Sequence, residues 1–284
     1  MKNTIRPIIG NLLSATLGNF FVLVQPQKAD ELSKKGMTLM LNSSDLSIKE
    51  RLMRRAILKK TEKRGNHDAL ASFHQNYWIN KGHDFFLRNR KKQEHIFLPD
   101  CEFIFDLLQE QLSKNPNSFN TLVEIGTGDG NVLQHLSTKF PQIEHFVGID
   151  LSEVQTETNT QTYKENPKLQ FVAADGFDWI KANGSANMIF VTFMGVLEYF
   201  TEQRLQQFFD MLYALGNIML VAIEPNGLDH DFSKNPNSQT YGFERSFSHN
   251  YPMLLKNSGF ELWHNSKKTL EENTNFIRFI GAMN

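Results

Sequence analysis

The chain has 284 residues, of which 40% are hydrophobic, 30 are Lys or Arg and 31 are Asp or Glu. This length and apolar content suffice for a packed core, arranged as one large domain or as a domain with an accessory part. The near-zero net charge conceals an asymmetry: residues 1–119 hold 19 basic against 12 acidic residues, while residues 120–284 hold 11 against 19. We therefore expect a basic N-terminal part and an acidic C-terminal part.

The single cysteine, Cys101, excludes an internal disulfide and a cysteine-based zinc cluster, and it favours a reducing compartment. Residues 1–25 begin like a secretory signal, since Lys2 and Arg6 precede an apolar stretch. Polar and glycine residues interrupt that stretch, and no small-residue cleavage site follows it. No uninterrupted run of about 18 apolar residues is present, so no membrane span is expected. These features predict a cytoplasmic protein.

The N-terminal part contains a basic helix. Residues 8–24 are predicted as a helix or an extended arm that packs on a partner, and a homodimer through this region is left open. Ser44 and Asp45 can cap a following helix with apolar residues at near-helical spacing. Its other face carries Arg51, Arg54, Arg55, Lys59, Lys60, Lys63 and Arg64. That face is a surface for nucleic acid or anionic lipid, or simply a solvated helix face, which we favour.

Residues 67–98 lack regular periodicity and are rich in aromatic residues and histidines. No histidine pair has the spacing of a helical zinc site, so no metal is expected. The aromatic residues form the core of a helical cap, or they line an acceptor pocket through Tyr77, Trp78 and Phe86. A helix from Pro99 to Leu112 ends in the turn 115–117, which predicts a helical cap of residues 1–119 and a second domain of residues 120–284.

The second domain is organised around residues 121–130, TLVEIGTGDG. A short apolar run ends in three glycines at alternate positions, and an amphipathic segment follows, which predicts a strand, a tight turn and a helix. Glycine tolerates positive φ and lets a ligand lie against the turn. Dinucleotide folds need a later third small residue, where this chain has Asn131, and Asp129 would repel a phosphate. These features argue against NAD and FAD.

Three further strands follow in order, at residues 146–150, 169–174 and 188–193. The first ends at Asp150, where a carboxylate can accept hydrogen bonds from both hydroxyls of a ribose. The second ends at Asp175, Gly176 and Phe177. The third leads into residues 194–200, MGVLEYF.

Glu124 followed by G-x-G-x-G resembles motif I of the class I S-adenosylmethionine-dependent methyltransferases, and MGVLEYF resembles that family's segment after strand four. The resemblance implies S-adenosylmethionine as cofactor, whose cationic sulfonium and ammonium suit an acidic turn. It implies that Asp150 holds the ribose and that Asp175 and Phe177 hold the adenine. The implied cofactor residues are Glu124, Gly126, Thr127, Gly128, Gly130, Asp150, Leu151, Asp175, Gly176, Phe177 and Phe193.

The rest of the chain completes the expected fold. A helix is predicted at residues 201–215, a strand at 217–223, a long polar loop at 224–246, a helix from Ser248 to Gly259, and strands at 260–264 and 275–282. The loop is too long for a simple connector, and it leaves the strand end at which open α/β sheets bind ligands. We expect an α/β fold with a seven-stranded, mostly parallel sheet, helices on both faces and an N-terminal helical cap.

The expected function is methyl transfer to an oxygen or nitrogen of a small-molecule acceptor. Methylation of RNA or protein through the basic helix is one alternative, and a non-catalytic cofactor-binding module is another. Residues expected to contact the acceptor are Tyr77, Trp78, Phe86, Met194, Glu198, Tyr199 and Tyr241. A hydroxyl acceptor also needs a base, for which histidine is suited near neutral pH. The candidates are His230, His249 and His83.

Overall fold

The computed structural model describes residues 14–37, 46–92, 98–114, 118–269 and 275–284. These residues form two compact units. Unit 1 comprises residues 1–80 together with residues 240–246, and unit 2 comprises residues 81–239 and 247–284. The boundary expected near residue 119 therefore lies inside unit 2.

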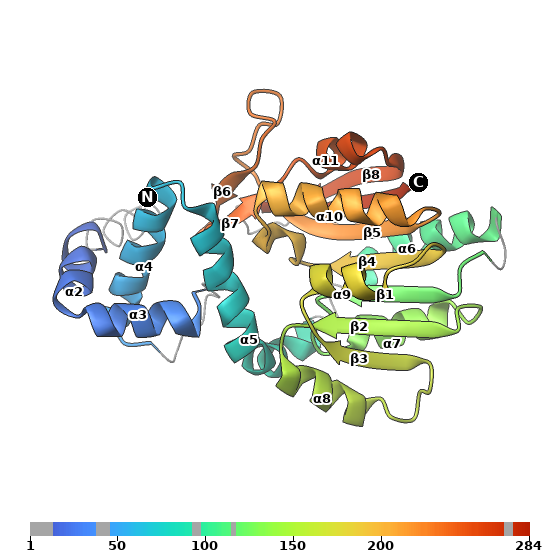
Figure 1. The fold of residues 1–284 in the computed structure, drawn as a ribbon, viewed down its shortest axis with the longest axis horizontal. Helices are drawn as coiled ribbons and strands as arrows, with labels where there is room; N and C mark the ends of the chain where they lie inside the picture. The colour runs from blue at the N-terminus through green and yellow to red at the C-terminus, as the bar shows by residue number, and fades with distance from the viewer. Residues whose placement is uncertain (1–13, 38–45, 93–97, 115–117, 270–274) are drawn as a thin grey trace. The chain divides into compact units, whose positions relative to one another are not determined.

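Unit 2 is built on a seven-stranded sheet of order β3-β2-β1-β4-β5-β9-β8 (Figure 1). Its strands are β1 (Thr121–Ile125), β2 (His145–Asp150), β3 (Leu169–Ala173), β4 (Met188–Phe193), β5 (Met219–Gly227), β8 (Glu261–Thr269) and β9 (Asn275–Met283). The five strands from β3 to β5 are parallel, whereas β9 pairs antiparallel with both β5 and β8. Both the expected mostly parallel sheet and its C-terminal antiparallel pair are confirmed.

Helices cover both faces of this sheet because its central strands are apolar on both sides. The helices are α6 (Leu98–Lys114), α7 (Asn131–Lys139), α8 (Glu153–Thr162), α9 (Gly176–Asn183), the short 3-10 helix η3 (Leu197–Tyr199), α10 (Glu202–Leu215) and α11 (Tyr251–Ser258). One buried cluster joins α6 and α7 to residues such as Leu122 and Val191. A second joins α10 and α11 to residues such as Val123 and Phe190. Alternate residues of one strand thus enter opposite cores.

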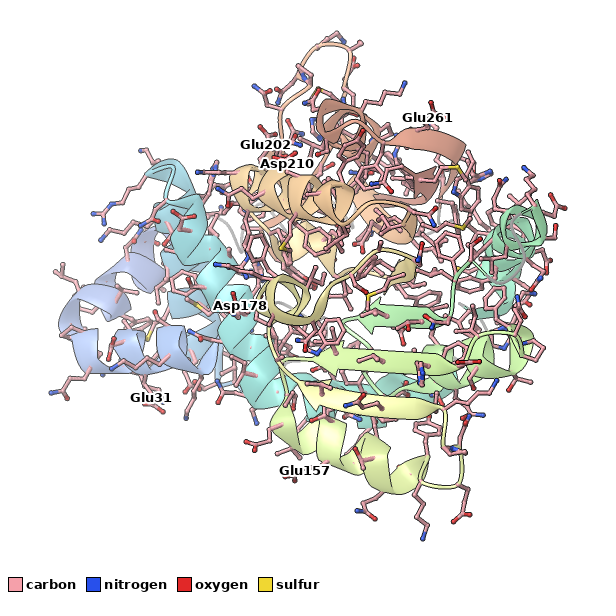
Figure 2. The ribbon with its side chains drawn as sticks, turned by 45° about the vertical axis from the view of Figure 1, so that its right-hand side comes forward. Glu31, Glu157, Asp178, Glu202, Asp210 and Glu261 are labelled. Carbon is pink, nitrogen blue, oxygen red and sulfur yellow. The ribbon has the colours of Figure 1, made fainter. Side chains whose placement is uncertain are left out.

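Acidic side chains are exposed on several elements of unit 2. Glu157 on α8, Asp178 on α9 and Asp210 on α10 are exposed, as is Glu261 at the start of β8 (Figure 2). No helix in the described part of the chain combines the length and apolar content that crossing a membrane requires.

Unit 1 is helical. It contains the π-helix η1 (Ser14–Gly18), α2 (Asn19–Val24), α3 (Pro26–Lys35), α4 (Ile48–Lys63) and the first part of α5 (His67–Lys92). A capping box starts α4: the Ser47 side chain accepts from the backbone of Glu50, and the Glu50 side chain accepts from the backbone of Ser47. The cap therefore lies at Ser47, because only that serine has a glutamate three residues on, while Ser44 and Asp45 fall outside the described residues.

Two findings about unit 1 differ from the expectations. The aromatic stretch after residue 67 forms one helix of 26 residues, α5, although its sequence shows no clear amphipathic period. In α4, Arg54 is buried, whereas Arg51 and Lys60 on the same basic run are exposed. The basic run is thus not one uniform solvated face. A separate two-stranded sheet, β6 (Gln239–Tyr241) with β7 (Ser246–Ser248), leads the chain into unit 1 and back out.

Candidate cofactor and acceptor site

The turn after β1 has the geometry that its glycines predict. Gly126, Gly128 and Gly130 have φ values of 71°, 55° and 75°, which favour glycine. The backbone N–H groups of Gly126 and Thr127 both donate to the carbonyl of Ile149, at 2.8 and 2.9 Å. The turn is thereby fastened to the end of β2, and α7 begins directly after it. We call this turn the glycine cradle: it has no side chain at three positions, and the side chains of Val196, Phe86 and Tyr163 pack closely against Gly126, Gly128 and Gly130.

Asp150 lies at the end of β2, beside this cradle. Its side chain is largely buried, and the residue is 8% exposed. Oδ2 accepts from the N–H of Gly128 at 3.1 Å, and Oδ1 accepts from the N–H of Ser152 at 2.9 Å. Burial raises the pKa of this carboxyl to about 6, although the backbone donors oppose the shift. The hydrogen bonds from the backbone thus offset only part of the free-energy cost of burying the Asp150 carboxylate.

The turn gathers further acidic groups. Glu124 in β1 is fully buried and accepts from Thr127 Oγ1 at 2.7 Å. Burial, together with the charges of Asp129 and Asp150, raises the pKa of Glu124 to about 8. Asp129 accepts from the backbone and side chain of Asn131, at 3.2 and 2.6 Å. A cationic ligand at this turn would relieve the repulsion among the three carboxyl groups.

A chain of side-chain hydrogen bonds joins the turn to α8 and α5. Asn159 Nδ2 donates to the carbonyl of Gly128 at 2.8 Å, and Gln155 Nε2 donates to Asn159 Oδ1 at 2.8 Å. The remaining amide oxygen of Gln155 lies 2.9 Å from Nδ1 of His83. Since an amide oxygen only accepts, His83 donates from Nδ1. In the neutral ring the lone pair then belongs to Nε2, for which the described residues offer no partner.

Phe86 lies directly against the turn. A methyl group added at Gly128 would come within 2.5 Å of the Phe86 ring, which shows how closely the ring approaches the backbone. Phe86 and Phe85 also pack edge to face, with ring centroids 5.4 Å apart. The C-terminal part of α5 therefore places an aromatic ring and a histidine beside the glycine cradle, all within unit 2.

Residues after β3 form the neighbouring part of the site. Asp175 caps α9, with Oδ1 accepting from the N–H groups of Phe177 and Asp178 at 3.0 and 3.3 Å. The same oxygen accepts from Arg204 Nη2 at 2.7 Å, and the guanidinium of Arg204 lies 5.3 Å from the centroid of the Phe177 ring. Gly176 packs on Ile125, where an added methyl group would meet a side chain at 2.5 Å. Leu151 is partly exposed at the end of β2.

The ends of β4 and β5 carry a buried polar group. After Phe193, Met194 and Gly195 have φ values of 58° and 100°, so the chain turns sharply. Glu224 in β5 supports this turn, because its Oε2 accepts from the N–H groups of Val196 and Leu197 at 3.0 and 3.1 Å. Burial, with a contribution from the charge of Glu198, raises the pKa of Glu224 to about 8.

Glu198 and Tyr199 lie in η3, directly after this turn. Glu198 is buried, and Tyr199 is half-buried. A methyl group added at Gly195 would meet Glu198 Oε1 at 2.6 Å, so this carboxyl packs on the turn itself. The carboxyl group of Glu198 therefore lies beside the turn at the carboxyl end of β4.

Two of the three candidate histidines fasten the loop after β5. His230 is buried, with Nδ1 2.9 Å from Ser248 Oγ and Nε2 3.0 Å from the carbonyl of Asn235. His249 is also buried, and its Nδ1 lies 2.6 Å from Ser238 Oγ. Burial lowers the pKa of His249 to about 3. Both ring nitrogens of His230 are thus engaged in the loop, and His249 is neutral near pH 7.

Three of the expected acceptor residues belong to unit 1. Tyr77 and Trp78 lie on α5 and pack edge to face, with ring centroids 5.4 Å apart. Tyr241 is half-buried in β6. Among the described residues, no group of three or more His, Cys, Asp or Glu side chains is arranged to hold a metal ion.

Sequence reasoning missed Arg204, Gln155 and Asn159. Arg204 lies on the polar side of a predicted amphipathic helix, and nothing in its sequence context distinguishes it from a solvated arginine. Gln155 and Asn159 are four residues apart, a spacing that places both on one face of a helix. That spacing was the available signal, but it does not identify the Gly128 carbonyl as a partner.

Comparison with known proteins agrees with this geometry. Residues 122–216 match a family model described as a methyltransferase domain. The sheet order and the glycine turn are those of the class I methyltransferase fold. Residues 122–216 are therefore part of a methyltransferase domain with this fold, and such a domain uses S-adenosylmethionine as its methyl donor. The expected family, fold class, enzyme activity and cofactor are confirmed.

Several solved structures are similar to this chain at low sequence identity. Magnesium protoporphyrin IX methyltransferase from Synechocystis PCC 6803 is 13% identical, with a TM-score of 0.45, over 80% of this chain and 94% of that one. N-methyltransferase NodS from Bradyrhizobium japonicum WM9 is 14% identical, with a TM-score of 0.48, over 65% and 96%. A methyltransferase from Leishmania major is 10% identical, with a TM-score of 0.49, over 72% and 82%. No curated protein matches the chain.

Proposed function

We propose that this enzyme methylates an oxygen or nitrogen of a small-molecule acceptor at the carboxyl ends of β1, β4 and β5. The observation that carries the proposal is the position of Phe86 and His83 beside the glycine cradle. An apolar ring against the turn and a partly exposed histidine next to it suit a small enclosed site. Such a site aligns the reacting atoms and excludes water.

In this proposal, Asp150 binds both ribose hydroxyls, and the cradle of Gly126, Gly128 and Gly130 lies against the amino-acid part of the cofactor. The fit rests on two observations: the cradle has no side chains, and the acidic groups around it favour a cation. Asp175 and Phe177 bind the adenine in this proposal, and Arg204, which donates to Asp175, orients that carboxylate. Bound S-adenosylmethionine supplies an activated methyl group on its sulfonium.

The acceptor wall consists of Phe86, the turn at Met194 and Gly195, and η3 with Glu198 and Tyr199. Met194 and Gly195 have positive φ values in this turn. The Glu224 carboxylate holds the backbone that follows, because it accepts hydrogen bonds from two consecutive N–H groups after Gly195. A rigid wall of this kind supports alignment of an acceptor lone pair. We include Tyr77, Trp78 and Tyr241 among the acceptor contacts on sequence grounds only.

His83 is the favoured base among the three candidates. Its Nδ1 donates to Gln155, so its Nε2 carries a lone pair and can accept a proton from an acceptor hydroxyl. His230 uses both ring nitrogens within the loop, and His249 is fully buried. The expected effect of His83→Gln is a fall in turnover with little change in cofactor affinity.

The alternative acceptor, RNA or protein, rests on the exposed basic end of α4, where Lys60, Lys63 and Arg64 face solvent. An RNA acceptor would give an affinity that falls steeply with salt. Charge reversal at these three residues separates the two proposals. It leaves small-molecule methylation unchanged but removes polyanion methylation.

The deciding experiment incubates the full chain with isotope-labelled S-adenosylmethionine and two acceptor pools, a deproteinised metabolite extract and total RNA. Labelled methyl in a small molecule, lost in His83→Gln and Phe86→Ala, supports the proposal. Lys256→Ala, a change at an exposed position of α11, is the matched control. Labelling of RNA alone would overturn the small-molecule assignment.

A further inference from the structure

Helix α8 buries polar side chains and exposes an apolar one. It packs on β2 and β3, yet its buried residues are Gln155, Thr156 and Asn159, whereas Val154 is 58% exposed. A surface helix ordinarily turns its apolar stripe toward the core, as α7 does with Leu133. Burying an amide also costs free energy unless the amide is hydrogen-bonded. Packing alone therefore does not account for the two buried amides of α8.

These two amides, which we call the amide relay, connect the glycine cradle to His83. Asn159 is 1% exposed and donates from Nδ2 to the carbonyl of Gly128 at 2.8 Å. Its Oδ1 accepts from Gln155 Nε2 at 2.8 Å, and Oε1 of Gln155 lies 2.9 Å from Nδ1 of His83. All four residues belong to unit 2. The amide relay thus runs from the backbone of the cradle to one ring nitrogen of the histidine.

The direction of every hydrogen bond in the amide relay is set at its Gly128 end. A backbone carbonyl only accepts, so Asn159 turns its amino group to Gly128 and its carbonyl oxygen to Gln155. Gln155 then presents its amino group to that oxygen, which leaves its own carbonyl oxygen for His83. Reversing either amide would set two donors or two acceptors against each other. The polarity of one peptide carbonyl therefore determines that Nδ1 of His83 carries a proton.

Gly128 also connects the amide relay to Asp150. The N–H of Gly128 donates to Asp150 Oδ2 at 3.1 Å, while its carbonyl accepts from Asn159. Both polar groups of this glycine are thus held by buried side chains, one from the end of β2 and one from α8. The carboxylate proposed for the ribose and the histidine proposed as base are therefore parts of one hydrogen-bonded unit.

We propose that Gln155 and Asn159 are positioning residues of the methyl transfer: they hold the neutral ring of His83 with its proton on Nδ1 and its lone pair on Nε2. The inference rests on the proposed function, in which His83 is the base for an acceptor hydroxyl. His83 is half-buried, and the described residues offer its Nε2 no partner, so this nitrogen is open to the hydroxyl. In the opposite tautomer Nε2 would already carry a proton and could not accept another.

The amide relay also determines the path of the proton. His83 Nε2 takes the proton of the acceptor hydroxyl, and the ring becomes a cation. Nδ1–H continues to donate to Gln155 Oε1, now as a charge-assisted hydrogen bond that stabilises the cation. The amide of Gln155 is too weak a base to take this proton. The proton therefore leaves to water from Nε2, and the ring returns to the same tautomer for the next turnover.

The first test measures the tautomer of His83 and needs no acceptor. Long-range proton–nitrogen NMR spectra of the full chain with isotope-labelled histidine distinguish a protonated from an unprotonated ring nitrogen, and His83→Gln identifies the His83 signals. At a pH where the ring is neutral, the wild type should carry the proton on Nδ1. Gln155→Leu should move the proton to Nε2, and Asn159→Leu should give a mixture, because the amide of Gln155 can then reverse. Gln161→Leu, at an exposed position of α8, is the matched control and should keep the wild-type tautomer.

A conservative variant separates the lost hydrogen bond from a general disturbance of α8. Gln155→Glu keeps an acceptor for Nδ1–H, so it should keep the proton on Nδ1, although it cannot donate to Asn159. A wild-type His83 with its proton on Nε2 would overturn the inference, and this measurement does not depend on the folding of any variant. A folded Gln155→Leu protein that retains the proton on Nδ1 would overturn it as well.

The second test measures turnover with labelled S-adenosylmethionine and the metabolite extract. Gln155→Leu should lower kcat about tenfold or more, because a proton on Nε2 removes the general base. The KM for S-adenosylmethionine should stay within about threefold, and Gln155→Glu should restore most of the lost kcat. An unchanged kcat in a Gln155→Leu protein whose tautomer has moved would overturn the positioning role. If no small molecule is methylated while the tautomer still depends on Gln155, the proposed function fails and the tautomer assignment stands.

Discussion

Asp150→Asn tests the cofactor site most sharply, because the structure separates its effect on binding from its effect on stability. The carboxylate holds the N–H groups of Gly128 and Ser152, one on each oxygen. Asparagine has a single acceptor oxygen, so one N–H loses its partner, a loss of about 1–3 kcal/mol. Removal of the buried charge offsets this loss: its pKa is raised from 3.8 to about 6, a shift equivalent to about 3 kcal/mol at pH 7. The unfolding free energy should therefore change little.

Cofactor affinity should respond differently. Two ribose hydroxyls lose a charged acceptor in Asp150→Asn, so binding should weaken by about 3 kcal/mol, or roughly 100-fold. The sign of the pH dependence follows from the same carboxyl. Hydrogen bonds from the ribose favour the charged form, so wild-type affinity should fall as pH falls through about 6. The variant has no carboxyl group at this position, so the difference in cofactor affinity between the two proteins should become smaller toward pH 5.

Calorimetric titration of both proteins with S-adenosylmethionine at pH 5, 6 and 7.5 measures the gap, and chemical denaturation measures stability. Glu157→Gln is the matched control, since Glu157 is an exposed acid of the adjacent helix α8 (Figure 2). An Asp150→Asn affinity within threefold of the wild type at pH 7.5, or a gap that stays constant down to pH 5, would refute the assignment of Asp150 to the ribose.

Gly128→Ala should weaken cofactor binding in calorimetry by at least about tenfold, because its φ is 55° and the added methyl group meets Phe86 at 2.5 Å. Adding Phe86→Ala should recover part of the loss, and Gly65→Ala, at φ 64° with open space, should leave binding unchanged. Ser248→Ala should lower the unfolding free energy by about 2–4 kcal/mol, since Ser248 Oγ accepts from Asn226 and Gly227 and bonds His230. Denaturation of the exposed Ser233→Ala should show almost no loss. Burial raises the pKa of Glu224 from 4.5 to about 8, so the folded state binds this proton more tightly than the unfolded state and the unfolding free energy of the wild type should fall as pH rises from about 4.5 to 8. Glu224→Gln has no carboxyl to titrate, so this fall should be absent in the variant. Parallel stability curves for wild type and variant would contradict that reasoning.

The fold and the cofactor cradle could be predicted from sequence because their signals are local. A short apolar run, three glycines at alternate positions and an acid at the end of the next strand each follow from backbone requirements. The proposed roles of Gly126 and Asp150 therefore follow from sequence signals alone. The order of the later strands also followed, since each apolar run was bounded by turn residues.

The helical part could not be predicted in the same way. The first part of α5 belongs to unit 1 and its last part to unit 2, and its apolar residues follow no single stripe. Arg54 shares its helix with exposed basic residues, and a linear pattern cannot tell which of them a distant segment covers. The partners of Glu62, Thr240 and Arg245, are about 180 residues away in the sequence. Likewise, the link from His83 through Gln155 to the glycine turn depends on tertiary packing.

The return of residues 240–246 to unit 1 sets the order in which the chain can fold during synthesis. Helices α3 to α5 leave the ribosome early, yet Glu62 and His74 meet their partners only after residue 245 has emerged. At about 5–20 residues per second, the helical unit waits roughly 8–30 s for the last of its own segments. Throughout that interval Glu62 and His74 lack the partners that residues 240–246 supply, although α4 can already pack on α3 through Met53. The N-terminal unit is therefore begun first but completed only when most of the methyltransferase sheet has already been translated.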